Sequence, residues 1–193
     1  MFTWLRDGAP AGRSCLEAQV MDLADDISYS VHDVEDAIVA GHVQLKWLDN
    51  PDQRARVVGY TQQWYLPGTD GAAIEEALKR LEGDSVWVRE SDGSRKSMAA
   101  LKDMTSQLIG RFCSSALNAT RDIYGPDPLT RYNAEMVVPE ETQLEIAVMK
   151  GLATTFVMTT DQRQPLYERQ REVLTNLVAQ LSATGDRHLE PMF

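Results

Sequence analysis

The sequence lacks several features that would assign it to a common functional class. It has only two cysteines, Cys15 and Cys113, and their wide separation gives neither a disulfide framework nor a paired metal-binding motif. No apolar run approaches the length needed to cross a bilayer, and no glycine-rich phosphate loop, CxxC pair or HExxH helix is present. These absences predict a protein of the reducing cytoplasm without a membrane partner.

Positive charge is also scarce. The formal net charge of the 193 residues is −10, which argues against nucleic acid as the main partner, because backbone phosphates are held by basic surfaces. A small phosphorylated substrate stays open, since a divalent cation and a few arginines can reverse the sign of the charge inside one pocket.

What is present is a repeated helical pattern of apolar residues. It predicts an all-α protein, a single helical domain over residues 1–193 without an internal linker, and at most one short β-hairpin. The alternation of RYNAEMVV predicts one strand of that hairpin at residues 131–138. Helices are expected over residues 15–40, from Asn50-Pro51-Asp52, and over 72–81, 144–158 and 166–181. A further long helix carries Met98 to Leu117 on its buried side and is broken by Tyr124-Gly125-Pro126-Asp127-Pro128.

The first of these helices has two contrasting faces. At about 100° per residue, one face carries five aspartates with a tyrosine and a histidine, and the opposite face is aliphatic. No lysine or arginine occurs between Arg13 and Lys46, so the carboxylates have no basic partner within the helix. We call this face the acidic stripe; it consists of Asp22, Asp25, Asp26, Tyr29, His32, Asp33 and Asp36.

Two interpretations of the acidic stripe follow. An acidic helix face is most often solvated surface, and a non-catalytic acidic helical interaction module would need nothing more. Against this, the stripe carries one sign of charge over about four turns, whereas surface charge is usually mixed. Unneutralised carboxylates gathered in this way are the donors that hard divalent cations prefer.

The segment EAQVMDLADDISYSVHDVED, residues 17–36, strongly resembles the HD-domain deoxynucleoside triphosphate triphosphohydrolases, the dGTPase-like family. The later segments LIGRF (108–112), EMVVP (135–139), Met149-Lys150 and RQR (169–171) are similar to that family as well. The resemblance implies part of an HD-domain-like helical bundle from a hydrolase that releases intact triphosphate from dGTP.

The resemblance also implies roles for residues of the stripe. Asp25 matches the family's final metal-ligating aspartate, Tyr29 would line the sugar pocket, and Asp33 would accept a hydrogen bond from the deoxyribose 3′-hydroxyl. These i, i+4 and i+8 positions point the same way on a helix. The implied partners are a deoxynucleoside triphosphate, a divalent metal such as Mg²⁺ or Mn²⁺, and further copies of the chain in a homo-oligomer.

The remaining family ligands, a histidine and a His-Asp pair, are missing from this sequence. His32-Asp33 is such a dipeptide, but it follows the final aspartate instead of preceding it. We therefore expect a C-terminal portion of a longer enzyme, which by itself binds no metal and is inactive. An HD-type phosphohydrolase acting on another phosphorylated small molecule is the alternative reaction.

Four basic residues are candidates for phosphate binding: Arg111, Lys150, Arg169 and Arg171. For each of them the ordinary alternative is a surface or interhelical salt bridge. Arg169 and Arg171 lie two residues apart, so at most one can face a given ligand from a regular helix.

Overall fold

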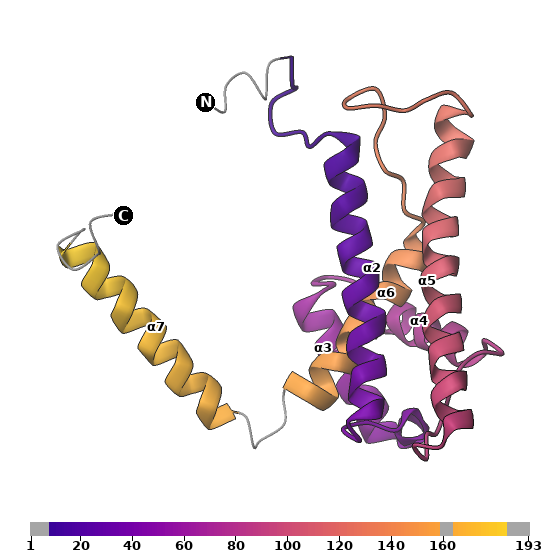
Figure 1. Cartoon of the computed structure of the whole chain (residues 1–193), viewed down its shortest axis with the longest axis vertical. Helices are drawn as coiled ribbons and strands as arrows, with labels where there is room; N and C mark the ends of the chain where they lie inside the picture. Colours follow the sequence, from indigo (N-terminus) through magenta and orange to yellow (C-terminus); the bar gives the residue numbers. More distant parts are fainter. Residues whose placement is uncertain (1–7, 159–163, 185–193) are drawn as a thin grey trace. The chain divides into compact units, whose positions relative to one another are not determined.

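The computed structural model describes residues 8–158 and 164–184, and the chain forms two compact units, residues 1–156 and 157–193. The described residues are helical and contain no β-strand, which confirms the all-α class. None of their helices is long and apolar enough to span a membrane. The elements (Figure 1) are α2 (Leu16–Val39), η1 (Leu45–Asp49), α3 (Pro51–Trp64), α4 (Gly71–Glu82), α5 (Arg95–Tyr124), α6 (Glu140–Ala153), the π-helical turn η2 (Thr154–Met158) and α7 (Gln164–Thr184).

Helix ends are set by local side-chain chemistry. The side chains of Asn50, Asp70 and Ser94 accept hydrogen bonds from backbone N–H groups in the first turns of α3, α4 and α5, at 2.8, 3.0 and 3.2 Å. These are the residue types that satisfy the otherwise unpaired donors of a helix N-terminus. Gly125, with φ of +77°, ends α5 in a conformation that disfavours side chains.

The centre of the first unit is α6, which contacts α2, α3, α4 and α5. Nearly every residue from Leu144 to Ala153 is buried, as expected for a helix covered on all sides. Gly151 allows the closest approach: a Cβ at this position would lie 1.8 Å from Oγ1 of Thr61 on α3.

Helices α2 and α5 lie side by side and run in opposite directions (Figure 1). The C-terminal half of α2 therefore meets the N-terminal half of α5, and Thr105 of α5 donates a hydrogen bond to Glu35 of α2 at 2.9 Å. Toward the other ends of the two helices, an apolar groove of about 360 Å³ lies between residues such as Val20, Leu23 and Leu117.

The strand predicted over residues 131–138 is wrong. The segment begins with a turn, in which Arg131 has φ of +51°, and continues without regular secondary structure. Its backbone N–H groups donate to side chains instead of a neighbouring strand: Met136 to Gln19 Oε1 at 2.9 Å and Val137 to Thr120 Oγ1 at 3.0 Å. Because these side chains satisfy the donors, the alternating pattern needs no sheet.

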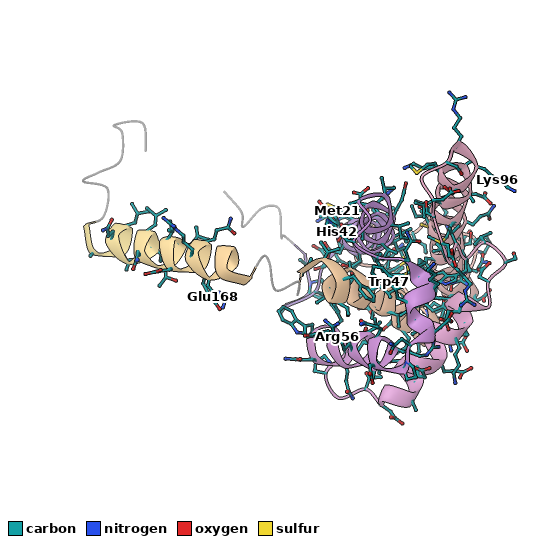
Figure 2. The ribbon with its side chains drawn as sticks, turned by 90° about the horizontal axis from the view of Figure 1, so that it is seen from below. Met21, His42, Trp47, Arg56, Lys96 and Glu168 are labelled. Atoms are coloured by element: carbon teal, nitrogen blue, oxygen red, sulfur yellow. The ribbon has the colours of Figure 1, made fainter. Side chains whose placement is uncertain are left out.

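The second unit contains α7. Its side chains from Glu168 to Ala183 are exposed, and they include the apolar series Val173, Leu174, Leu177, Val178 and Leu181. Figure 2 marks Glu168 on this helix. The expectation that residues 1–193 form one domain stays a prediction, and the polar segment at 159–163 lies outside the described residues.

Candidate functional site

The acidic stripe lies on the exposed side of α2, as its periodicity predicts. Asp25 is exposed and Tyr29 keeps 62% of its accessible surface, whereas Asp33 is half-buried. Burial raises the pKa of Asp33, the neighbouring Asp36 charge raises it further, and the charge of His32 offsets part of the shift. The stripe therefore grades from a fully solvated carboxylate at Asp25 to a partly desolvated one at Asp33.

One basic side chain reaches the stripe from another helix. Lys150 of α6 pairs with Asp26 at 2.6 Å, and its Nζ lies 5.7 Å from the ring centroid of Tyr65. The Tyr65 hydroxyl hydrogen-bonds Thr154 Oγ1 at 2.7 Å. Asp22, Asp26, Tyr65 and Lys150 line a shared pocket of about 350 Å³, so the predicted phosphate-binding lysine does lie next to the stripe.

Arg111 is engaged in ion pairs between helices. Its guanidinium contacts Glu145 of α6 at 2.6 Å and Asp84, which follows α4, at 3.2 Å. Glu145 also accepts from Arg80 at 2.9 Å. This is the salt-bridge alternative considered for Arg111, and the structure does not bring it into the pocket that holds Lys150. Arg169 and Arg171 are exposed on α7 in the second unit.

Sequence reasoning missed the buried carboxylates. Glu35 keeps only 2% of its accessible surface and is contacted by Lys102 and Thr105 of α5 and by His32 Nδ1 at 3.3 Å. Burial acts to raise the pKa of Glu35, but the hydrogen bonds from Lys102 and Thr105 outweigh it and leave the pKa below the ordinary value. A signal was present, since Glu35 falls between Val31, Val34 and Ile38 on the aliphatic face of α2.

A divalent metal fits these residues only in part. The stripe offers carboxylate oxygens, the donors that Mg²⁺ and Mn²⁺ prefer. Within the described part of the chain, however, no group of three or more His, Cys, Asp or Glu side chains is placed to hold a metal ion. A complete metal site would need donors in addition to those described.

Comparison with protein families defines the class. The family model described as "Phosphohydrolase-associated domain" matches residues 136–193, a range that includes α6 with Lys150. The chain is thus similar to proteins that contain, or accompany, an HD-type phosphohydrolase.

Curated relatives resemble the whole chain. A protein of Streptomyces coelicolor is 47% identical over 194 residues, covering 100% of this chain and 46% of the relative. A Bifidobacterium longum protein is 43% identical over 183 residues, covering 95% of this chain and 38% of the relative. A Corynebacterium diphtheriae protein is 35% identical over 202 residues, covering 100% of this chain and 46% of the relative. All three are named deoxyguanosinetriphosphate triphosphohydrolase-like protein.

Over nearly all of its own residues the chain is similar to these deoxyguanosinetriphosphate triphosphohydrolase-like proteins, which confirms the resemblance to the dGTPase-like HD-domain family. It spans less than half the length of these relatives, which is consistent with the expectation of a longer parent enzyme. No solved structure matches the chain.

Proposed function

We propose that this chain supplies the nucleotide-facing helix of a phosphohydrolase that converts a deoxynucleoside triphosphate, dGTP first among them, to the deoxynucleoside and triphosphate. The observation that carries the proposal is the exposed stripe of α2, in which Asp25, Tyr29 and Asp33 share one side while an ion pair links the same stripe to α6. The names of the relatives support the same reaction class.

Each of the three residues has a role that suits its surroundings. Asp25, exposed and one turn before Tyr29, contributes a carboxylate oxygen to a divalent cation. The exposed ring of Tyr29 offers an apolar face to the sugar. Asp33 accepts a hydrogen bond from the 3′-hydroxyl, and its partial burial strengthens that bond because less water competes for the carboxylate.

The basic residues divide into two groups under this proposal. Lys150 is the favoured phosphate contact, since it lies in a pocket shared with Asp22 and Asp26. Arg111 is assigned to interhelical packing because Glu145 and Asp84 occupy its guanidinium. Roles for Arg169 and Arg171, homo-oligomeric assembly, cytoplasmic location and inactivity of this chain alone stay predictions.

The test is an Asp25→Ala substitution in the longer parent protein. Hydrolysis of dGTP, followed as release of tripolyphosphate with Mg²⁺ or Mn²⁺ present, should fall by at least about a hundredfold, the scale on which removing a metal-site or charge-stabilising group acts. The matched control is Asp103→Ala, which removes an exposed aspartate of α5 outside the stripe.

Three results would contradict the proposal in different ways. Normal turnover by the Asp25→Ala enzyme removes Asp25 from the site. Release of single phosphates from other substrates, without tripolyphosphate from dGTP, favours a different phosphohydrolase. Absence of any hydrolysis by the wild-type parent favours an acidic interaction module.

A further inference from the structure

The histidine of the acidic stripe, His32, is anchored to a buried carboxylate of the same helix. His32 Nδ1 lies 3.3 Å from Oε2 of the buried Glu35, while half of the His32 side chain is exposed. Glu35 itself is held by Lys102 and Thr105 of the neighbouring helix α5. The imidazole is thus fixed on its inner side and open on its outer side.

The hydrogen-bond acceptor in the His32–Glu35 pair determines which ring nitrogen of His32 carries the proton. Glu35 is ionised at neutral pH, because its pKa lies below the ordinary value, and an ionised carboxylate can only accept hydrogen bonds. His32 Nδ1 therefore carries the proton. A carboxylate that fixes one ring nitrogen sets the tautomer and the orientation of the ring, and leaves the other nitrogen to a ligand. Within the described residues, Nε2 of His32 has no hydrogen-bond partner.

The position of His32 on α2 determines which part of a bound nucleotide its side chain can reach. It follows Asp25 by seven residues, which is about 10 Å along the helix axis, and it directly precedes Asp33. The charged groups that interact with it are Glu35 and Asp33 on α2; Asp36 lies beyond Asp33, and Lys102 lies beyond Glu35 on α5. The surrounding carboxylates repel a phosphate, whereas a neutral sugar or base is tolerated.

We propose that His32 is a substrate-contacting residue whose Nε2 hydrogen-bonds the nucleoside part of the substrate, and that buried Glu35 is the positioning residue that orients it. This inference rests on the proposed function, because the nucleoside is placed relative to Asp25 and Asp33. It extends the site from three residues of α2 to His32 and to the buried anchor three residues further along the same helix.

The experiment compares steady-state hydrolysis of dGTP by the longer parent protein and its variants. His32→Ala should raise KM about tenfold, the effect of one lost hydrogen bond, with kcat nearly unchanged, since the contact is made in ground state and transition state alike. The matched control is His42→Ala, because His42 is exposed just beyond the same helix and is labelled in Figure 2. Its KM should equal that of the wild type.

Two further variants separate positioning from packing. Glu35→Gln should raise KM as well, because the amide binds the imidazole less strongly than the carboxylate does. Leu101→Ala loosens the packing of α5 by truncating a fully buried side chain, but it leaves the contacts of Glu35 with His32 and Lys102 in place, so its KM should stay near the wild-type value. An equal rise in KM for Leu101→Ala would show that helix packing is responsible and would overturn the role of Glu35.

Substrate analogues can show which part of the nucleotide His32 contacts. If His32 contacts the 3′-hydroxyl, the effect of His32→Ala should vanish with 2′,3′-dideoxyGTP; if it contacts the base, the effect should persist there and change with dATP. Either result supports a nucleoside contact. A changed inhibition constant for inorganic tripolyphosphate would instead assign His32 to the phosphates and overturn the proposal.

Failure of this inference can be told apart from failure of the proposed function. A wild-type parent that hydrolyses dGTP, with an unchanged KM in His32→Ala, overturns only the role of His32. A wild-type parent without hydrolysis overturns both.

Discussion

The two ends of the α2–α5 pair differ sharply. At one end, Ile27, Val31 and Val34 of α2 are almost fully buried, and Glu35 is held by α5. At the other end, Val20 and Leu117 keep 43% and 56% of their accessible surfaces and line an open apolar groove. We refer to these as the closed end and the open end.

The difference shows that amphipathic periodicity alone does not decide burial. The same aliphatic spacing runs from Val20 to Ile38, yet only the part from Ile27 onward is almost fully buried. The closed end carries Glu35 and His32, and the open end carries Asp22 and Asp25. The proposed nucleoside end of the stripe therefore lies on a tightly packed part of α2, whereas the proposed metal end lies on the part next to the open groove.

The largest expected contrast between the ends comes from two leucines of α5. Leu108→Ala at the closed end should lower the free energy of unfolding by about 2–5 kcal/mol, because Leu108 is fully buried and its removal leaves a cavity. Leu117→Ala at the open end should lower it by less than about 1 kcal/mol, since the side chain is largely exposed. Urea denaturation followed by circular dichroism measures both values.

Equal losses for the two leucines would mean that the groove is closed in solution. A loss at Leu117 that appears only in the longer parent protein would mean that the rest of that protein covers the groove.

The next effect concerns the tightest contact in the first unit. Gly151→Ala should lower the free energy of unfolding by about 1–3 kcal/mol, because its Cβ would meet Thr61 and overpack the α3–α6 contact. Rotation of the Thr61 side chain would move Oγ1 away, but Cβ and Cα of Thr61 lie 3.0 and 3.3 Å from that Cβ position, so a contact tighter than normal would remain. Thermal unfolding monitored by circular dichroism gives the measurement.

Gly110 provides the matched glycine. It lies within α5 with open space around its Cβ position, so Gly110→Ala should stabilise the protein by about 0.5–1 kcal/mol through helix propensity. If both substitutions had the same sign, the contact between Gly151 and Thr61 would not be as close as described.

The last expected effect is the pH dependence that Glu35 contributes to stability. Its pKa in the folded protein lies below the ordinary value of 4.5, so its contribution to stability is complete above that pH and is lost as the pH falls through the folded-state pKa. Glu35→Gln should cost about 1–2 kcal/mol at pH 7, and the difference from wild type should shrink in acid. Urea unfolding of both proteins at pH 7 and below pH 4 tests this.

A difference between wild type and Glu35→Gln that is constant with pH would contradict the ionised state of Glu35. The tautomer assigned to His32 would then lose its physical basis.

Much of the fold could be predicted from local chemistry. Asn50-Pro51 and Gly125-Pro126 mark a helix start and a helix end that the structure confirms, because capping and proline constraints act within a few residues. The prediction of a strand at 131–138 was wrong because its backbone N–H groups donate to the side chains of Gln19 and Thr120, which are distant in the sequence. An alternating pattern does not reveal such partners.

The candidate site likewise has features that the sequence predicts and features that it does not. Periodicity places Asp25, Tyr29 and Asp33 on one side of α2, since their spacing is a local property of a helix. The pairing of Asp26 with Lys150 and of Glu35 with Lys102 joins residues that are far apart in the sequence. Tertiary contacts of this kind decide which charges are neutralised, and helical spacing carries no information about them.

The first turn of α2 has a consequence for how this helix can loosen. The backbone N–H of Leu16 donates to the carbonyl of Arg131 at 2.6 Å, and the Glu17 carboxylate accepts from the Arg131 N–H at 3.1 Å. The helix is therefore secured at its tip and again beyond Ile27, with the uncovered stretch in between. Fraying from the terminus is opposed by these contacts, so among the amide protons that have a helical acceptor, those around Met21 should exchange faster than those beyond Ile27.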